Sequence, residues 1–377
     1  MDFLTKRQEK FYRAMEKTPL TKALLTDWFI IKGRQKIDYY SQKIDDAIRN
    51  YKGNEAWLDD PKAVKKARRE IIFHMFSYGI LPYEYYMFRF RDCSPRKKDS
   101  FLTDKLTVAN LHKLNDYAYL DLFNNKWKTY EKYGQFYGRR LVRIASEEDR
   151  PVFDDFVKDN PVFVKKGEYG AMGRTVEKVD TSDYPSMDSL FAHLMAELKT
   201  LDKGGLVLEE LIHQSADMAS LNPTSVNPLR LMTLLNDDGE VIYKFPWMKI
   251  GRNGSFVDNG GSGGMFVQVD EKTGIVRTNG ATETGEVYYI HPDTGTVIPG
   301  FQVPDWEQAL ELGRKLAPIT PRVRYVGWDL AHTDKGWIVV EGNFASQSLY
   351  QNCDQMGRRY DMAAIVDNLK DLSEIPE

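Results

Sequence analysis

The sequence predicts an α+β protein in which a helical N-terminal region precedes a strand-rich remainder. First, apolar side chains in residues 1–105 recur with helical spacing, between residues that favour helix ends. Second, short apolar runs alternate with helical segments from about residue 106 onwards. Third, strands follow one another beyond Pro223, separated by Asp-Gly and Thr-Gly turns. Few βαβ units are expected, so the predicted sheets are mixed.

Length and composition fit a globular protein of two or three lobes. The chain has 377 residues, of which 42% are hydrophobic, and a formal net charge of -3. Its 19 Phe, 21 Tyr and 7 Trp exclude a disordered chain. Two isolated cysteines form neither a disulfide framework nor a zinc site, so we expect a reducing cytoplasm. The start of the chain is too charged for a signal peptide, and no run of eighteen apolar residues predicts a membrane span.

Charge is unevenly distributed along the chain. Residues 1–105 carry 23 Lys and Arg against 15 Asp and Glu, a net charge of +8, whereas the remainder carries 29 against 40, a net charge of -11. A basic lobe suits an anionic partner such as a nucleic acid, a membrane surface or an acidic glycan. The alternative is that these charges form solvated helix faces. No nucleic-acid motif accompanies them, so no nucleic-acid partner is expected, while peripheral contact with a membrane stays open.

The helical region contains two well-marked segments. Asp60 suits the N-cap position and Pro61 the first turn, and the helix that they begin is predicted to stop at Gly79. A second helix is predicted over residues 37–51, where apolar residues recur with helical spacing.

Further helices are predicted over 125–133, 147–159, 187–200 and 306–316. Strands are predicted over 140–144, from residue 161, and over 205–212, 229–235, 241–249, 265–269 and 287–290.

Residues 325–343 predict a β-hairpin on which the sequence places three oxygen-bearing side chains. If the turn centres on Lys335, Asp329 and Glu341 lie directly opposite each other. Asn343 lies two residues beyond Glu341 and therefore shares its face. Two carboxylates and an amide oxygen are ligands that suit Mg²⁺.

The alternative interpretation of this hairpin is a solvated polar face. Its other positions argue against solvation, because they are apolar: Trp328, Leu330, Ile338 and Val340. Acids in a buried sheet need a partner or an ion. The hairpin is therefore predicted to be central, with its acids held either by a partner or by a metal ion.

A lysine near the end of an apolar strand precedes a glycine-spaced loop. Lys165 is followed by Gly167, Gly170 and Gly173, and glycines allow backbone N–H groups to approach phosphate oxygens closely. The order of residues matches neither a P-loop nor a dinucleotide fingerprint. A plain turn is the alternative.

Two further segments carry polar groups in apolar surroundings. Glu209 and Glu210 end the strand over 205–212, whose backbone at Glu210 and Ile212 is suited to a purine edge. Arg230 lies on an apolar strand, where a buried arginine needs an acidic partner or an anion, and both alternatives stay open. Lys249 and Arg252 precede a glycine-rich loop of the kind that closes over reactive intermediates.

In this order, the motifs resemble the ATP-grasp superfamily, and most closely its sugar-transfer associated family. The resemblance rests on YGILPYEYY, VFVKKGEYGAMG, VLEELIHQ, SVNPLRLMT, VDNGGSGGM, HPDTG and VGWDLAHTDKGWIVVEGN, which extend over roughly residues 78–345. It implies an ATP-grasp fold, in which two α+β lobes grip ATP, with the N-terminal helical region added. The implied domains are a helical region over 1–105, a pre-ATP-grasp subdomain over 106–160 and an ATP-grasp domain over 161–377, whose lobes divide near 213.

The resemblance also implies roles for individual residues, with ATP and one or two Mg²⁺ ions as cofactors. Lys126 and Lys165 are expected at the ATP phosphates, with the loop from Gly167 through Gly170 to Gly173 closing over them. Adenine is expected at Glu209, Glu210 and Ile212. The metal ligands are expected to be Asp329, Glu341 and Asn343, with Glu341 bridging.

The implied activity is that of an ADP-forming carboxylate–amine ligase acting through an acyl phosphate, in polysaccharide or secondary-metabolite biosynthesis. Small-molecule carboxylates and amines are the implied substrates. Relatives that join amino acids have an arginine two residues before the metal aspartate, whereas this chain has Gly327 there. Arg230, Lys249 and Arg252 are the candidate catalytic cations in its place. The alternatives are an ATP-grasp kinase that phosphorylates a hydroxyl group, and a non-catalytic nucleotide-binding scaffold.

Overall fold

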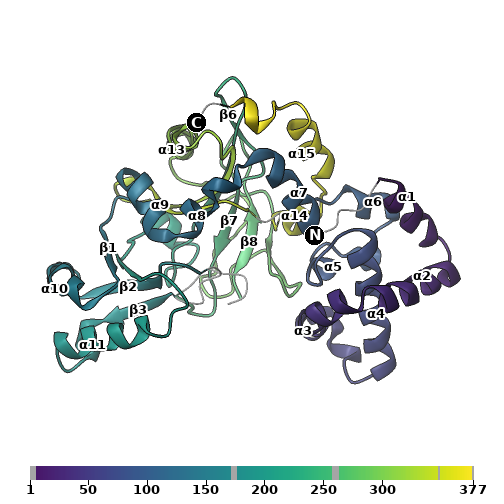
Figure 1. Cartoon of the computed structure of the whole chain (residues 1–377), viewed down its shortest axis with the longest axis horizontal. Coiled ribbons are helices and arrows are strands. Elements are labelled where there is room, and N and C mark those ends of the chain that lie inside the picture. Colours follow the sequence, from purple (N-terminus) through teal and green to yellow (C-terminus); the bar gives the residue numbers. More distant parts are fainter. Residues whose placement is uncertain (1–5, 171–175, 257–262, 347–348, 376–377) are drawn as a thin grey trace.

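The computed structural model describes residues 6–170, 176–256, 263–346 and 349–375. Within them, a helical region and two sheets lie in a row, with the helical region at the right of Figure 1, the larger sheet at the centre and the smaller sheet at the left. This arrangement confirms the predicted α+β class and the helical N-terminal region. None of the helices in the described ranges is both long and apolar enough to cross a bilayer.

The N-terminal helices begin and end where local chemistry favours it. Thr18 caps α2 through its hydroxyl, which accepts a hydrogen bond from Thr21 N at 3.2 Å. Asp60 caps α4, and Gly79, with a φ of +70°, follows its end, as predicted. The helices of this region are α1 (Lys6–Met15), α2 (Pro19–Lys32), α3 (Arg34–Asn50), α4 (Pro61–Ser77), α5 (Glu84–Met87) and α6 (Pro95–Ser100).

The smaller sheet is antiparallel and has the strand order β1-β4-β2-β3. Its strands are β1 (Leu141–Ile144), β2 (Val162–Gly167), β3 (Glu177–Asp180) and β4 (Leu206–Glu210). Two helices, α10 (Arg150–Asp159) and α11 (Met187–Leu198), cover one face and share a core with Phe163 and Leu208. Val207 points to the other face, where it joins the core of the larger sheet.

The larger sheet has the strand order β10-β9-β8-β7-β5-β11-β12, with β6 paired to β5. The predicted strand over 241–249 is two strands, because the chain turns at Phe245, whose φ is +54°. Trp328 is completely buried on β11, which lies next to the edge strand β12, so the hairpin is not at the centre of the sheet. The strands are β5 (Leu229–Leu235), β6 (Val241–Tyr243), β7 (Trp247–Ile250), β8 (Met265–Gln268), β9 (Gly280–Ala281), β10 (Val287–Tyr288), β11 (Tyr325–Thr333) and β12 (Gly336–Asn343).

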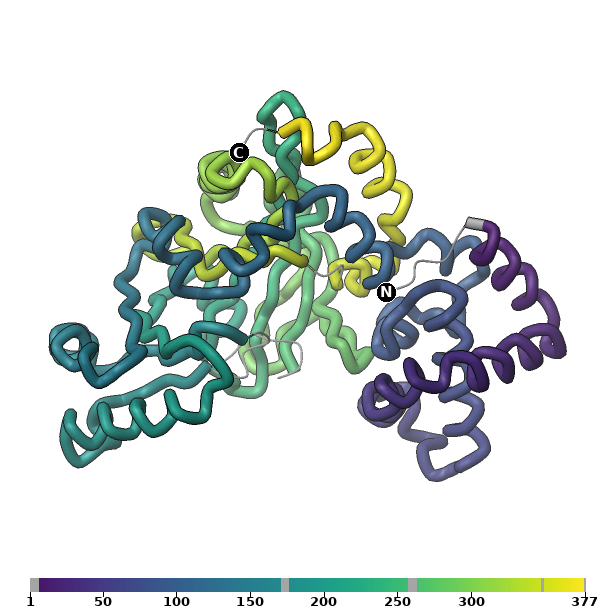
Figure 2. Tube along the Cα trace, viewed as in Figure 1, coloured from purple at the N-terminus to yellow at the C-terminus, as the bar shows by residue number. Residues whose placement is uncertain are grey.

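The remaining helices connect and flank these units. They are α7 (Asp104–Leu114), α8 (Leu120–Asn124), α9 (Lys126–Tyr133), α12 (Ala216–Ala219), α13 (Trp306–Leu316), α14 (Gln351–Asp354) and α15 (Arg359–Val366). Near the C-terminus, α15 runs beside α7, as the yellow and blue segments of Figure 2 show, and Met362 and Leu111 share a core there. Trp247 and Phe266 join the larger sheet to the core of the N-terminal helices.

The arrangement of β1 bears on the domain boundaries. The sequence placed β1 and α10 in a subdomain over 106–160, separate from the lobe that begins at 161. In the structure β1 pairs with β4, and α10 shares the core of β2 to β4. The boundaries therefore stay a prediction, and residues 141–159 pack with the smaller sheet.

Candidate active site

The hairpin of β11 and β12 places Asp329 directly opposite Glu341, as predicted. The pairing at the turn does not by itself give this register. Thr333 pairs with Gly336, and a regular hairpin continued from that pair would place Asp329 opposite Val340. A register shift after Asp329 makes Val340 the extra residue of a bulge. The bulge therefore restores the pairing on which the candidate metal site depends.

Two cations hold the buried Asp329 carboxylate. Arg230 lies opposite Asp329 on β5; its Nε bonds to Oδ1, and its Nη2 donates to Oδ2 at 3.0 Å. Lys249 Nζ, from β7, donates to Oδ2 at 2.9 Å. Burial alone would raise the pKa of Asp329, but Arg230 and Lys249 hold it well below its usual value. Asp329 is therefore a carboxylate at neutral pH.

The glycine at position 327 makes room for Arg230. A Cβ atom there would lie 3.0 Å from Arg230 Cδ and 2.5 Å from Ser346 Oγ. Ser346 Oγ accepts a hydrogen bond from Arg230 Nη1 at 3.1 Å. The side chain of Arg230, from the neighbouring strand, thus passes over Gly327.

Glu341 and Asn343 add oxygen donors to the same face. Asn343 Nδ2 donates to the Gly327 carbonyl at 3.2 Å and contacts Glu341 Oε1 at 3.3 Å.

An ionised carboxylate has about four lone-pair positions, and Arg230 and Lys249 use three of those on Asp329. Nowhere in the described ranges do three His, Cys, Asp or Glu side chains gather as a metal cluster, and this set has only two carboxylates. It still fits Mg²⁺, which binds few protein ligands and keeps waters or phosphate oxygens.

Adjacent lysines on β2 point to opposite faces of the smaller sheet. Lys165 lies on the helix-covered face, where its Nζ contacts Glu177 at 2.6 Å and also binds Glu197 of α11. Burial opposes its charge, but these two carboxylates raise its pKa above the usual value. Lys166 lies on the face toward the larger sheet, and its Nζ donates to Glu209 at 3.1 Å. The sequence singled out Lys165, and its role at ATP stays a prediction.

Lys126 is held beside the base of the glycine loop. Its N–H donates to the Glu168 carbonyl at 2.9 Å, and its Nζ donates to the Gly170 carbonyl at 2.8 Å. Burial lowers the pKa of Lys126, and Glu341 and Glu209 counteract this effect.

Charges from both sheets act on Lys126: Glu341 belongs to the larger sheet, and Lys166 and Glu209 belong to the smaller one. Gly167 pairs with Leu206 in the sheet, whereas Gly173 lies outside the described residues.

Arg139 is a site residue that the sequence did not indicate. Its Nη2 donates to Glu209 at 2.9 Å, and its Nη1 donates to the Val339 carbonyl at 2.6 Å, next to the bulge. Burial would raise the pKa of Glu209, but Lys166 and Arg139 hold it below its usual value. No local sequence signal marks Arg139, since it precedes β1 in an irregular segment.

The remaining predicted residues lie at the edges of this cluster. Glu210 exchanges backbone and side-chain hydrogen bonds with Arg140, which fixes the end of β4 against β1. Ile212 is half-buried in the connection between the two sheets. Arg252 pairs with Glu286 at 2.8 Å and Tyr288 at 2.6 Å, whereas Arg230 and Lys249 converge on Asp329.

A family profile described as sugar-transfer associated ATP-grasp matches residues 110–359, about two thirds of the chain. The chain belongs to the sugar-transfer associated ATP-grasp family. The matched range contains both sheets and every residue of the cluster described above. The comparison with curated protein sequences found no match.

This ATP-grasp chain is also similar to solved structures, at low identity. N5-carboxyaminoimidazole synthetase from Staphylococcus aureus, complexed with ADP, matches 63% of this chain and 48% of its own at 8% identity, with a TM-score of 0.38. Phosphoribosylamine–glycine ligase from Thermotoga maritima matches 65% and 52% at 13% identity and a TM-score of 0.39. D-alanine–D-alanine ligase from Helicobacter pylori matches 68% and 62% at 13% identity and a TM-score of 0.40. The chain thus spans less than two thirds of the length of each.

Proposed function

We propose that this protein is an ATP-dependent carboxylate–amine ligase that acts through an acyl-phosphate intermediate. The observation that carries the proposal is the cluster at Asp329. Two buried cations, Arg230 and Lys249, lie beside a carboxylate that faces Glu341 and Asn343 across the hairpin. A site with both cations and metal-suited oxygens can neutralise a phosphoryl group and a carboxylate together.

In this proposal ATP lies between the two sheets. Lys126 and Lys166 reach the phosphates, because both lie at the base of the glycine loop on the side of the larger sheet. Lys165 supports β2 from the opposite face through Glu177 and Glu197. Adenine stacks beyond the end of β4, near Glu209, Glu210 and Ile212, where the chain crosses between the sheets.

Glu341, Asn343 and the remaining lone pair of Asp329 would hold Mg²⁺. When bound, such an ion supplies positive charge to the oxygens of the transferring phosphoryl group. The protein contributes the fixed geometry of the donors, because the bulge at Val340 and the Asn343 contact with Gly327 orient them.

The proposed reaction has two steps. A substrate carboxylate oxygen attacks the γ-phosphorus of ATP, and the bond to the β-phosphate oxygen breaks to release ADP. An amine then attacks the acyl carbon, phosphate leaves, and the amine loses a proton to solvent. Arg230 and Lys249 can stabilise the oxyanion of this second step, since their charges are already fixed at the site.

The family is described as associated with sugar transfer, and this supports our proposal that the reaction belongs to polysaccharide or secondary-metabolite biosynthesis in the cytoplasm. The substrates would be a sugar acid or another small carboxylate, and an amine.

Hydroxylamine trapping tests this proposal. The protein is incubated with Mg²⁺-ATP, hydroxylamine and pooled small carboxylates and sugar acids, and the products are separated. A ligase yields ADP and a hydroxamate that identifies the carboxylate. ADP with a stable phosphorylated compound and no hydroxamate would instead indicate a kinase. Unchanged ATP turnover in Asp329→Asn would contradict the metal assignment.

A further inference from the structure

The exposed side of α2 is an apolar ridge. Its buried side presents Leu25 and Phe29 to the core of the N-terminal helices. On the opposite side, four large apolar residues recur at intervals of four, four and three positions and therefore share one face. They are Leu20, Leu24, Trp28 and Ile31, which are 70%, 58%, 47% and 73% exposed. We call these four residues the α2 ridge.

A basic groove lies between α2 and α4, and the stripe of α2 that lines it, next to the ridge, is formed by Pro19, Lys22, Ala23 and Thr26. The groove has a volume of about 590 Å³ and is lined by six cationic side chains against two carboxylates, those of Glu16 and Glu70. The cations are Lys17, Lys22, Lys62, Lys65, Lys66 and Arg69. Lys22 pairs with Glu70 at 2.6 Å, and Arg69 pairs with Asp27 at 2.6 Å. Among the residues that the structure describes, no carboxylate lies within ion-pair distance of Lys62, Lys65 or Lys66.

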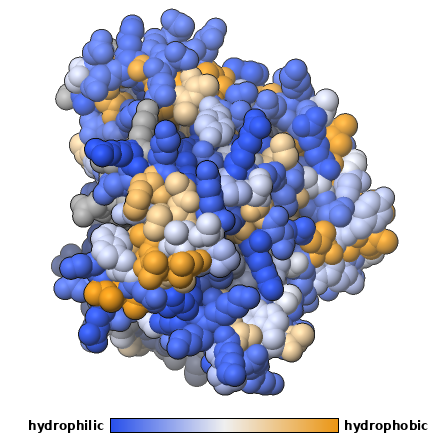
Figure 3. All heavy atoms as spheres, turned by 90° about the vertical axis from the view of Figure 1, so that its right-hand side faces the viewer, coloured by the Kyte–Doolittle hydropathy of each residue, from blue (hydrophilic) through white to orange (hydrophobic). Residues whose placement is uncertain are grey.

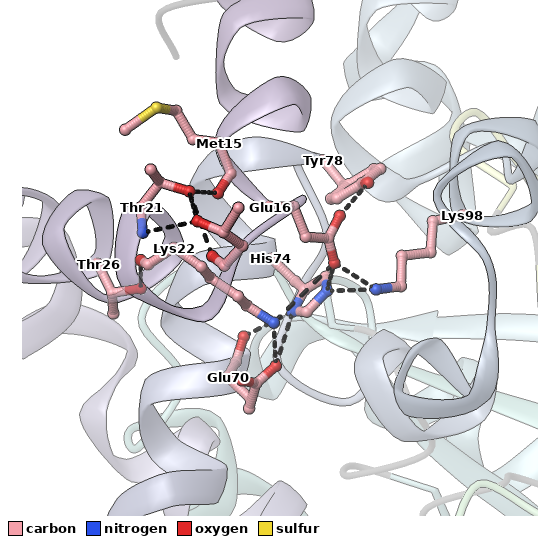
Figure 4. A network of polar contacts seen from close by, with 10 residues as sticks. Met15, Glu16, Thr21, Lys22, Thr26, Glu70, His74, Tyr78 and Lys98 are labelled. Atoms are coloured by element: carbon pink, nitrogen blue, oxygen red, sulfur yellow. Dashed lines mark hydrogen bonds and ion pairs between the residues drawn. The ribbon is translucent and has the colours of Figure 1, made fainter.

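A buried polar network fixes the corner between α1 and α2, and with it the position of the ridge (Figure 4). The Glu16 carboxylate accepts hydrogen bonds from Lys98 Nζ and from the Tyr78 hydroxyl, each at 2.5 Å. Lys98 Nζ also lies 3.0 Å from His74 Nε2. Thr21 Oγ1 closes the corner by donating to the Met15 carbonyl at 2.6 Å. These contacts hold the corner from which α2 and its ridge extend.

We propose that this face docks on an anionic lipid bilayer, with α2 lying in the plane of the interface. Leu, Trp and Ile side chains fit the boundary between headgroups and acyl chains, and the lysines of the groove fit anionic headgroups. Figure 3 views the molecule from the side of the helical region and shows hydrophobic side chains in orange among hydrophilic ones in blue.

Other occupants fit this face less well. A second copy related by twofold symmetry would bring two grooves of the same charge together. A nucleic acid or a soluble acidic glycan would use the lysines and leave the α2 ridge in water. Docking on a bilayer satisfies the charged and the apolar features at once, and it would bring the cluster at Asp329 near membrane-associated substrates.

Vesicle co-sedimentation of the full chain tests this inference. Vesicles of phosphatidylcholine alone are compared with vesicles that contain about 30% phosphatidylglycerol, which supplies the anionic surface. We expect binding only to the anionic vesicles. Lys62→Gln, Lys65→Gln and Lys66→Gln together should lower the partition coefficient on the order of 100-fold, since each charge contributes about fivefold. Leu24→Ser with Ile31→Ser should lower it at least on the order of 10-fold.

Matched variants away from this face should bind like the unmodified protein. Lys132→Gln, Lys158→Gln and Lys335→Gln remove three exposed lysines, and Val152→Ser with Val287→Ser removes two exposed apolar side chains. As a second measurement, the fluorescence of Trp28 should shift to the blue on binding. The Trp28 signal is the difference between the unmodified protein and Trp28→Phe, which keeps an aromatic side chain in the ridge.

Three results would overturn the inference. The first is the absence of binding to anionic vesicles. The second is binding that depends on the lysines and not on the α2 ridge, without a Trp28 shift, which would indicate adsorption by charge alone. The third is a dimer that dissociates in Leu24→Ser with Ile31→Ser in the absence of lipid, which would assign the ridge to a second copy.

Discussion

Arg139 and Glu209 form a buried ion pair at 2.9 Å that joins the two sheets of the ATP-grasp fold. Glu209 belongs to β4 of the smaller sheet, while the same guanidinium donates to the Val339 carbonyl of β12 in the larger one. The pair therefore fixes the proposed adenine strand relative to the bulge that positions Glu341.

Arg139→Ala should destabilise the protein by about 3–5 kcal/mol, because it leaves the Glu209 carboxylate buried with one cation fewer. Urea unfolding measures the change. Arg140→Ala is the matched control: its pair with Asp155 is exposed, and its loss should cost about 1 kcal/mol or less. Equal costs for the two variants would contradict a structural role for Arg139.

Lys165→Met and Lys166→Met should differ although the residues are adjacent. Lys166 faces the proposed phosphate site, so its loss should weaken ATP binding roughly 10-fold or more, as expected for a lost charge-assisted contact. Lys165→Met leaves Glu177 and Glu197 without their shared cation and should lower stability while ATP affinity changes little. Calorimetric ATP titration and thermal melts separate these effects. The reverse pattern would return the phosphate role to Lys165.

Gly327→Ala should displace Arg230, because the added Cβ would lie 2.5 Å from Ser346 Oγ and 3.0 Å from Arg230 Cδ. We expect a destabilisation of about 1–3 kcal/mol, typical of overpacking. ATP turnover should fall more than ATP affinity, since Arg230 lies by Asp329. Gly134→Ala provides the control, because the nearest atoms to a Cβ there belong to Tyr130, at an ordinary contact distance of 3.5 Å or more. Full turnover in Gly327→Ala would rule out a catalytic role that depends on the position of Arg230.

Stability should depend on pH through His74. Its Nδ1 faces the Glu70 carbonyl at 2.7 Å and must carry the proton, so Nε2 accepts from Lys98. Burial lowers the pKa of His74 from 6.5, and the positive charge of Lys98 lowers it further, although Glu16 opposes this.

The unfolded chain therefore binds a proton near pH 6.5 that the folded protein does not. The free energy of unfolding should fall as pH decreases below about 6.5, by at most about 1.4 kcal/mol per pH unit. The Glu16 carboxylate contributes to the free energy of unfolding over a lower pH range. Burial raises its pKa, but the hydrogen bonds from Lys98 and Tyr78 lower the pKa by more, so its stabilisation is lost only below about pH 4.5.

Urea unfolding between pH 7.5 and 5 measures the slope. His74→Gln should flatten it, whereas His213→Gln, which alters an exposed residue, should not. A slope that persists in His74→Gln would locate the titrating group elsewhere.

Local sequence patterns predicted most elements of the fold. Asp60, Pro61 and Gly79 delimit α4 because capping and left-handed conformations are properties of single residues and their neighbours. The hairpin over 325–343 was predicted from alternation and a turn glycine, and the pairing of Asp329 with Glu341 is as expected. That pairing depends on the bulge at Val340, which the assumed turn did not include.

The sequence by itself determined which chemical groups are available: a hairpin with two carboxylates and an amide, a strand with two lysines, and a basic helical region. Only the tertiary structure decided how they are used. Because side chains alternate along a strand, Lys165 and Lys166 point to opposite faces of the smaller sheet. Which of these two faces is covered is decided by the packing of α11. Arg139 reaches Glu209 and Val339 from an irregular segment, and Arg230 crosses over Gly327 from a neighbouring strand. These contacts join residues far apart in the chain, and the free energy that fixes them comes from burial, which no local pattern specifies.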